Sequence, residues 1–316
     1  MSNILVLGGS GFVGRHVCEK LVRAGHRVTV PTRRAVNAAP VQHLPGLTVR
    51  QANVHDGHAL RQLLPRHDAV VNLVAILHGD EAAFERTHVT LPTILAQACE
   101  ATGVRRLVHI SALGADVRGP SRYQRSKARG EAVLQSAALA LTILQPSVIF
   151  GAGDRFLNLF AQLQSVFPVM PLAGADTRFQ PVWVEDVAQA VVRCLGSDAV
   201  ARASIGQTIE CAGPDVLTLA ELVRLAGRYG SRERPVIPLP HSIGRVQAMA
   251  MECLPGEPLM SRDNLDSMRV DNVASGRWPG LDSLGIRPAS VLAIAPSYLG
   301  QRGGRSGLLS LRSGRR

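Results

Sequence analysis

The chain has 316 residues, of which 46% are hydrophobic and 19% charged, values typical of a globular protein with one or two domains. Its net charge of +11 would suit a nucleic acid or an anionic membrane as partner, but five arginines and no acid lie in the last 17 residues, 300–316. This Gly-, Ser- and Arg-rich tail is predicted to be disordered. It offers no aromatic residues for base stacking, which argues against nucleic acid as the partner.

Cysteine usage and hydropathy exclude several protein classes. The five cysteines are scattered, odd in number and without a C-x-x-C pair, so neither a disulfide framework nor a zinc site is predicted, and no metal ligands are assigned. The longest apolar run, 69–77, has the length of a strand and is too short to span a membrane. Because the first strand begins near Asn3, no signal segment is expected. The predicted location is cytoplasmic, with attachment to the inner face of the membrane as an option.

The first half of the chain alternates short apolar runs with segments of helical periodicity. Strands are predicted at 3–9, 26–34, 47–54, 67–77, 105–114 and 141–151, and helices at 11–25, 82–102 and 122–137. Strands that are apolar on both faces and separated by helices indicate a parallel sheet covered on both sides. The predicted fold is therefore α/β, with a doubly wound parallel (Rossmann) sheet and a smaller C-terminal substrate lobe.

After Gly151 the alternation becomes less regular. A strand running into a helix is predicted over 178–195, a further strand over 208–216 and a helix over 217–230. We predict an NAD(P)-binding domain at 1–230, with 152–180 contributing to the substrate side, a small lobe at 231–299 and the tail at 300–316. The apolar stretch 156–172 has helical spacing, and core packing, a substrate pocket and a membrane-facing helix all remain open for it.

The sequence GGSGFVG carries three glycines at equal spacing, Gly8, Gly11 and Gly14, between a predicted strand and a predicted helix. In such a turn Gly8 permits a tight bend, Gly11 lets a pyrophosphate approach the backbone, and Gly14 permits close helix–sheet packing. The N–H groups of a helix that begins at Phe12 and Val13 would bind the phosphates. The motif predicts a dinucleotide site.

The end of the second strand bears on the choice of cofactor. An NAD site usually places an acid there for the ribose 2′-hydroxyl, whereas this chain has Thr32, Arg33 and Arg34. The missing acid and the two arginines favour NADP(H) over NAD(H). At the end of the third strand, Asn53 and its neighbour Val54 are assigned to the adenine side, with a turn-forming role for Asn53 as the alternative.

Tyr123 and Lys127 are one helical turn apart in a chain that has only two lysines and three tyrosines. Residues at i and i+4 share a helix face, so both side chains can reach one ligand. A neighbouring ammonium favours the phenolate form of tyrosine, which makes Tyr123 the predicted acid–base residue and Lys127 its partner on the cofactor ribose. Ser111 ends the preceding strand and is predicted to hold a substrate oxygen.

In this order, the glycine triplet, the strand-end serine and Y-x-x-x-K resemble the extended short-chain dehydrogenase/reductase superfamily. The segments HISALGAD, SRYQRSKARGE, PSVIFGAGDRFLN and PLMSRDN are similar, more narrowly, to the atypical subgroup containing the nucleotide-binding accessory subunit of respiratory complex I and its bacterial relatives. The closer resemblance runs to about residue 275. It implies an NAD(P)H-binding fold, in some members with the cofactor held as a structural element.

Three departures from the typical extended pattern argue against sugar-nucleotide epimerisation and leave the proton relay incomplete, and the substrate side shows no recognisable chemistry. His88 stands where an Asn is usual, Gln145 where an Arg often precedes Pro-Ser, and ISALGAD replaces the stretch common in sugar-nucleotide epimerases. We therefore expect a cofactor-holding subunit or assembly factor of a respiratory, complex I-like system. The alternatives are an NADPH-dependent reductase of an apolar carbonyl or quinone, a sugar-nucleotide epimerase or dehydratase, and a redox-sensing regulator.

Overall fold

The structure is a computed structural model that describes residues 1–230, 232–253 and 258–299. The predicted tail, 300–316, lies outside the described residues. Unit 1 consists of Met1–Pro146, Val184–Cys211 and Ala274–Arg287, and unit 2 of Ser147–Trp183, Ala212–Val273 and the chain from Pro288 onward. The chain thus passes between the units several times, and the boundary predicted after residue 230 falls within unit 2, to which the predicted substrate-side segment 152–180 also belongs.

Unit 1 is built on a seven-stranded sheet in the order β11-β6-β5-β4-β1-β2-β3. All of its neighbouring strands pair in parallel. The strands are β1 (Asn3–Leu7), β2 (Arg27–Thr32), β3 (Leu47–Gln51), β4 (Ala69–Asn72), β5 (Arg106–Ile110), β6 (Ala140–Pro146) and β11 (Thr208–Cys211). The predicted doubly wound parallel sheet is confirmed.

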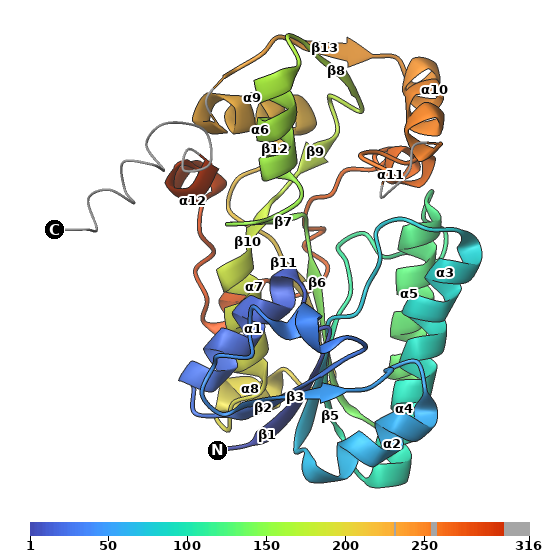
Figure 1. Ribbon diagram of the computed structural model, residues 1–316, viewed down its shortest axis with the longest axis vertical. Helices are drawn as coiled ribbons and strands as arrows, with labels where there is room; N and C mark the ends of the chain where they lie inside the picture. Colours follow the sequence, from blue (N-terminus) through green and yellow to red (C-terminus); the bar gives the residue numbers. More distant parts are fainter. Residues whose placement is uncertain (231, 254–257, 300–316) are drawn as a thin grey trace, which may run out of the picture. The chain divides into compact units, whose positions relative to one another are not determined.

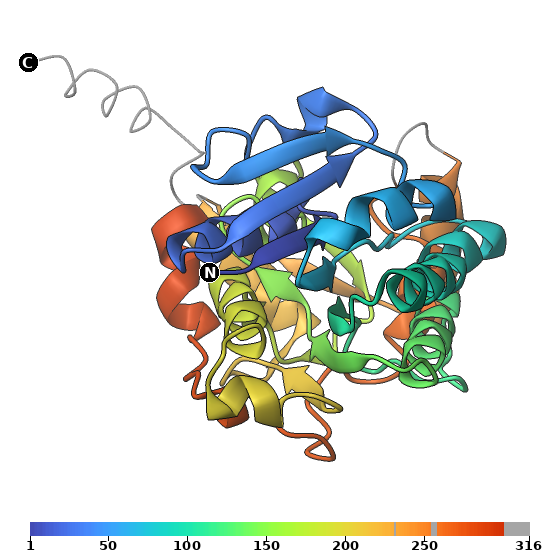
Figure 2. The same cartoon turned by 90° about the horizontal axis from the view of Figure 1, so that it is seen from below.

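Helices cover both faces of this sheet (Figures 1 and 2). One face carries α1 (Phe12–Arg23), α7 (Val184–Cys194) and α8 (Ala199–Ala203), and the other α2 (Gly57–Leu63), α3 (Glu81–Glu85), α4 (Leu91–Thr102) and α5 (Arg122–Gln135). Short 3-10 turns lie at Ala35–Ala38, Leu64–Arg66 and Leu281–Leu284. The core between the sheet and the second group of helices consists of Leu, Val, Ile and Ala side chains with Cys99.

The helix predicted over 82–102 is not continuous. Between α3 and α4 the chain forms a π-helical turn, η3 (Arg86–Thr90), in which Thr87 and His88 are buried. Pro92 lies at the start of α4, where a missing backbone N–H does no harm. π-Helical turns place side chains out of the regular helical register and are frequent at functional sites.

Unit 2 contains three helices that pack on one another, α6 (Leu157–Val166), α9 (Leu219–Gly230) and α12 (Val291–Leu299). Its β8 (Met170–Ala173) and β13 (Val236–Leu239) form a parallel ribbon, and α10 (His241–Glu252) contacts α11 (Arg262–Ser267). Two further pairs are β7 (Ile149–Phe150) with β10 (Val182–Trp183), and β9 (Arg178–Phe179) with β12 (Leu217–Thr218).

The apolar stretch 156–172 is helical only as far as Val166. Phe156, Phe160 and Leu163 pack against the unit 2 core, as expected for core packing. Phe167 follows the helix and keeps 51% of its surface exposed. The helical spacing therefore predicts a longer helix than the structure contains. Pro168 has no backbone N–H to continue the helix, and the chain turns into β8.

Asp154 of the GAGDRF segment has a structural role. Its carboxylate accepts hydrogen bonds from the backbone N–H groups of Gly151, Phe156 and Asn158 and from the hydroxyl of Tyr298 in α12. Because these four donors use the carboxylate, Asp154 joins the start of α6 to α12 and is not free to act on a substrate. No helix in the described ranges is long and apolar enough to cross a membrane.

Candidate active site

The carboxyl ends of the parallel strands of unit 1 bring the predicted site residues to one edge of the sheet. The glycine turn follows β1, Arg33 follows β2, Asn53 comes shortly after β3, and Ser111 follows β5. β1 lies between β2 and β4, which is the point where the strand order reverses. In open α/β sheets, ligands bind outside the carboxyl ends of the strands at this switch point.

The glycine turn has the geometry of a phosphate cradle. Gly8 has a φ of +80°, which residues with a side chain rarely adopt. A Cβ on Gly14 would collide with the carbonyl oxygen of Gly8 and the backbone of Gly9, so α1 can pack against the turn only with glycine there. No side chain caps the N-terminus of α1, whose first residues are Phe12 and Val13. The turn leaves those backbone N–H groups for a ligand.

The cationic end of β2 is exposed, as an incoming phosphate requires. Arg33 and Arg34 are both exposed, and neither pairs with a carboxylate within the ranges that the structure describes. Thr32 turns inward and donates to the carbonyl of Arg34, which shapes the bend. Asn53 accepts from the backbone N–H of His55, so it forms the turn that was its alternative role. Val54 packs against the core of unit 1.

A capping box fixes the start of α5. Ser121 accepts from the backbone N–H of Gln124, whose side chain accepts from the Ser121 N–H in return. From this start, Lys127 is buried and donates from Nζ to the carbonyl of Ile110 at 3.1 Å. Burial lowers the pKa of the Lys127 ammonium to about 8, while Glu131 acts in the opposite direction. Lys127 therefore lies beside the end of β5, on the sheet side of α5.

Tyr123 lies in an aromatic cluster with Phe84 and His88. Its ring makes edge contacts with both, at centroid distances of 6.3 and 5.6 Å. Burial raises the pKa of the phenol. The expectation that Lys127 lowers the pKa of Tyr123 is therefore wrong for this arrangement. The ammonium is directed to the carbonyl of Ile110, and the effect of burial on the phenol dominates. At neutral pH Tyr123 is a proton donor, not a phenolate.

Ser111 supplies a buried hydroxyl without a partner. Its Oγ makes no well-formed hydrogen bond to any described residue, although it lies beside Glu131, where burial raises the pKa of the carboxyl and the Ser111 hydroxyl acts in the opposite direction. A buried polar atom without a partner is costly and calls for a ligand or water. Together with the glycine cradle, this hydroxyl makes the edge fit a nicotinamide dinucleotide and a substrate oxygen.

His88 occupies the position where the extended pattern usually has an asparagine, and both of its ring nitrogens are engaged. Nε2 accepts from the backbone N–H of Ile76, so the proton must lie on Nδ1, which donates to Ser126 Oγ at 2.8 Å. Ser126 in turn donates to the carbonyl of Tyr123. Burial, with repulsion from Lys127 and His109, lowers the pKa of His88 to about 2. The neutral His88 ring therefore links the loop after β4 to α5 through two hydrogen bonds.

Sequence reasoning missed the buried polar residues behind this edge. Glu131 was not singled out, and Gln145 was noted only as a departure, yet the Gln145 amide nitrogen lies 2.8 and 3.1 Å from the two Glu131 oxygens. Asn72 and His109 are also buried and bonded to each other. The available signal was the presence of polar residues inside otherwise apolar strands and on the inner face of α5.

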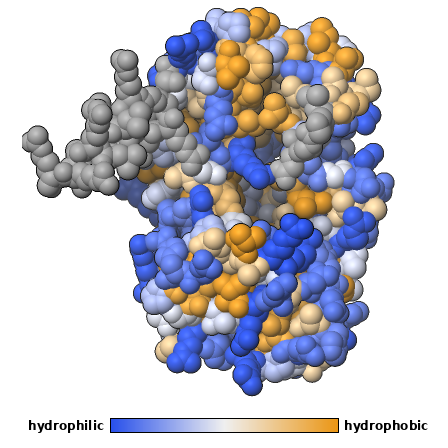
Figure 3. Space-filling model, in the orientation of Figure 1, coloured by the Kyte–Doolittle hydropathy of each residue, from blue (hydrophilic) through white to orange (hydrophobic). Residues whose placement is uncertain are grey.

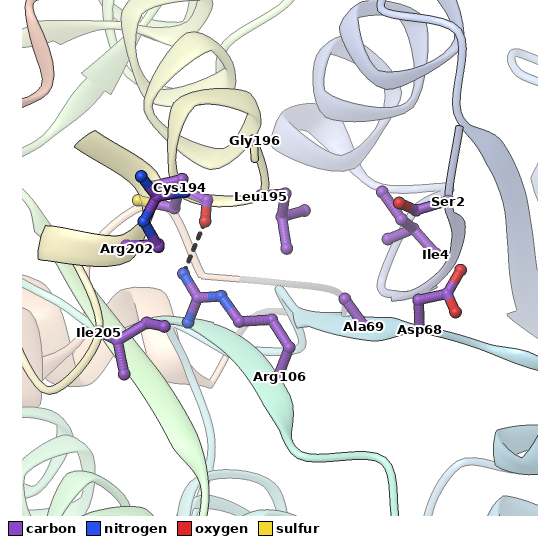
Figure 4. A pocket seen from close by; sticks show the side chains of 11 residues that line it. Ser2, Ile4, Asp68, Ala69, Arg106, Cys194, Leu195, Gly196, Arg202 and Ile205 are labelled. Carbon is purple, nitrogen blue, oxygen red and sulfur yellow. Dashed lines mark hydrogen bonds between the residues drawn. The ribbon is translucent and has the colours of Figure 1, made fainter. Parts of the chain in front are cut away.

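The pocket drawn in Figure 4 lies at the opposite edge of the sheet, where β1, β4 and β5 begin. Two arginines line it: Arg202 donates to the carbonyl of Ser197, and Arg106 donates to the carbonyls of Ala140 and Cys194 and to the hydroxyls of Thr142 and Ser204. With its N–H donors engaged in this way, Arg106 ties β5 to its neighbours and has little left for a ligand. We assign the pocket a structural role.

Comparison with known proteins agrees with this geometry. The profile of the NAD dependent epimerase/dehydratase family matches residues 4–206. The chain belongs to this family. The resemblance to extended short-chain dehydrogenases is thereby confirmed, and with it the expectation of a nicotinamide-dinucleotide fold.

The relatives of this chain include two proteins with different descriptions. The chain is 33% identical over 297 residues to "NADH dehydrogenase [ubiquinone] 1 alpha subcomplex subunit 9, mitochondrial" of Mus musculus, covering 90% of this chain and 76% of the relative. It is 28% identical over 191 residues to "Ceramide reductase" of Caulobacter vibrioides, covering 60% and 59%. The structure of Pal from Bacillus thuringiensis superposes with a TM-score of 0.73 at 17% identity, covering 98% and 99%, and so shares the fold.

Proposed function

We propose that this extended short-chain dehydrogenase holds NADP(H) as a bound element and does not turn it over, as a subunit or assembly factor of a respiratory, complex I-like system. The observation that carries the proposal is the bonding of His88. A proton relay needs a group that can accept on one side and donate on the other as protons move. His88 has both nitrogens committed to fixed partners and stays neutral, so it stiffens the site where a relay would be.

The preference for NADP(H) rests on the end of β2. Arg33 and Arg34 are exposed there, and the carboxylate that would accept from a ribose 2′-hydroxyl is missing from that turn. A guanidinium binds a phosphate by charge-assisted and often bidentate hydrogen bonds. The cations at this corner of the sheet therefore favour a 2′-phosphate over a 2′-hydroxyl.

Residues at three places of the chain would bind the dinucleotide. The glycine turn and the first N–H groups of α1 hold the phosphates, and Arg33 lies at the adenosine end. Lys127, a compact cation with three donors, reaches the ribose hydroxyls while one donor stays on Ile110. When bound, the nicotinamide ring can donate or accept a hydride. Tyr123 holds a phenolic proton beside this site, and Ser111 holds an unpaired hydroxyl.

A second candidate function is an NADPH-dependent reductase of an apolar carbonyl or quinone. It is favoured by the protonated Tyr123 and the unpaired Ser111, the two donors that a developing oxyanion needs. Similarity to a protein named ceramide reductase points the same way. In that case a proton would have to reach Tyr123 by a path that does not include His88.

Attachment to a membrane or membrane complex is part of the proposal. Unit 2 leaves Val166, Phe167 and Val169 exposed in one short segment, and Ile243 and Val246 exposed on α10. Figure 3 shows apolar side chains among hydrophilic ones on the face that carries α6 and α9. With the arginines of 300–316, these residues favour contact with an anionic surface.

The experiment that tests the holding role compares Tyr123→Phe with Lys127→Ala. If the chain only holds NADPH, Lys127→Ala weakens NADPH binding, while Tyr123→Phe leaves binding unchanged and there is no turnover to lose. If it is a reductase, Tyr123→Phe lowers turnover by 10²- to 10⁴-fold at unchanged affinity. Arg66→Ala, an exposed cation at the opposite edge of the sheet, serves as the control for general loss of charge.

A further inference from the structure

The inner face of α5 carries three ionisable residues at successive turns, Tyr123, Lys127 and Glu131. Glu131 is 8% exposed and Lys127 2%, so both charges lie out of water. Among the described residues, Lys127 and Glu131 do not form a direct ion pair with each other. They stand one helical turn apart, a spacing that brings side chains onto the same face.

Glu131 has neutral groups around its carboxylate: the amide of Gln145 and, beside it, the hydroxyl of Ser111. Gln145 on β6 is buried, and its Nε2 lies 2.8 and 3.1 Å from the two carboxylate oxygens. An amide N–H satisfies a buried carboxylate without cancelling its charge, whereas a cation at the same position would neutralise it. Burial raises the pKa of the Glu131 carboxyl, while Ser111, Gln145 and Lys127 act in the opposite direction. Glu131 is therefore held in place by neutral partners that do not cancel the charge of its carboxylate.

The other groups that face Lys127 are uncharged. Tyr123 on α5 is a protonated phenol, and His88 on η3 and His109 on β5 are neutral, with pKa values lowered to about 2 and about 3 mainly by burial. Gln145 on β6 carries no charge. The other charged residues of α5 and of the helical elements packed against it have exposed or partly exposed side chains: Glu81, Glu85, Arg86, Glu100, Arg122, Arg125 and Arg129. Among these groups Glu131 is the one buried charge that can offset the ammonium.

We propose that Glu131 is a positioning residue that keeps Lys127 charged at neutral pH, and that Gln145 enables this by binding the carboxylate through an uncharged amide. The inference rests on the proposed role of the site in binding NADP(H), since a charged Lys127 is what that role requires. Three residues of α5 then act together: the carboxylate of Glu131 is held by β6, the ammonium of Lys127 is held by β5, and the phenol of Tyr123 lies at the substrate side.

The chain offers an unusually direct test because Lys20 and Lys127 are its only lysines. Lysine labelled with ¹³C at Cε gives one NMR signal for each, and Lys20→Arg identifies which signal belongs to Lys127. In the parent, Lys127 is expected to titrate at a midpoint near 8, because burial lowers its pKa to about that value. Lys20 lies elsewhere, partly exposed and paired with Glu185, so its signal serves as the internal comparison.

Glu131→Gln keeps the size of the side chain and an oxygen that can accept from Gln145, but removes the charge. The Lys127 midpoint should then fall by at least about one pH unit, because the ammonium loses the attraction that favours it. Gln145→Arg should lower the midpoint in the same direction, since its guanidinium neutralises Glu131. Glu85→Gln, which removes a carboxylate paired with Arg129 on the outer face of α5, should leave the midpoint unchanged.

NADPH affinity measured from pH 6 to pH 9.5 gives the second readout. The ratio of the Glu131→Gln dissociation constant to that of the parent should rise with pH, by up to about tenfold, as the variant loses its lysine charge first. A merely structural role would change affinity by the same factor at every pH. Thermal melting of each variant at pH 7 separates misfolding from a shifted titration.

The outcomes separate this inference from the proposed function. Equal Lys127 midpoints in the parent and a folded Glu131→Gln would overturn the inference, whatever the nucleotide does. A lowered midpoint in a chain that fails to bind NADPH would support the inference and overturn the proposed function. A lowered midpoint together with an affinity ratio that rises with pH is the result that both predict.

Discussion

Lys127 shows at the level of one residue why this arginine-rich chain keeps a lysine. Its surroundings offer a backbone carbonyl, Ile110 O, and one carboxylate a turn away, in a space closed to water. A guanidinium brings five N–H donors that stay charged at any accessible pH, and most would be left without acceptors here. An ammonium is smaller and can share its three donors between the protein and a ribose. The small number of acceptors around this position therefore explains why a lysine stands here and not an arginine.

Arg33 carries the prediction on cofactor choice. Arg33→Ala should remove most of the preference for NADPH over NADH, because one charge-assisted phosphate contact is worth about 1.4 kcal/mol, or about tenfold in affinity. Fluorescence titration of both nucleotides into parent and variant measures the preference, and Arg66→Ala gives the matched loss of an exposed charge. Equal affinities of the parent for NADPH and NADH would rule out the assignment.

At the scale of elements, the contact between α5 and η3 depends on a glycine. Gly130 lies against the carbonyl of His88, and a Cβ there would collide with that oxygen. The π-helical turn therefore fits against α5 only where α5 has no side chain. This close approach positions His88 between Ser126 and the loop after β4.

Gly130→Ala should destabilise the fold by about 1–3 kcal/mol, the usual cost of overpacking, in spite of the higher helix propensity of alanine. Urea unfolding measures the change. Arg129→Ala, on the exposed side of the same turn, should cost well under about 1 kcal/mol because its ion pair with Glu85 is solvent-exposed. If the two variants were equally stable, the close packing of η3 on α5 would not hold in solution.

Periodicity and glycine spacing were enough to predict the sheet, its doubly wound form and the edge where the site lies. The strands are apolar on both faces, and Gly8 and Gly14 meet backbone that leaves no room for a side chain. The interruption of the predicted 82–102 helix could not be foreseen, because the π turn follows from contact with Gly130, far along the chain. The pairing of Glu131 with Gln145 was missed for the same reason, because the sequence does not show which polar side chains of α5 and β6 come together in the fold.

At the scale of the whole molecule, contact with an anionic surface is predicted to depend on the C-terminal arginines. Each basic residue near such a surface contributes about 1 kcal/mol at low salt. Truncation after Gly300 should therefore reduce co-sedimentation with vesicles that contain anionic lipid, and added salt should release the full chain. Zwitterionic vesicles are the control. Sedimentation that changes with neither truncation nor salt would remove the electrostatic part of the proposal.

NADPH oxidation by the parent chain, offered a panel of quinones, aldehydes and ketones, decides between holding the cofactor and turning it over. A chain that holds NADP(H) should bind it and show no turnover with any member of the panel, and Tyr123→Phe should behave as the parent does. Turnover above about 1 per second, within the ordinary range of enzymes, would contradict the holding role if it were lost in Tyr123→Phe.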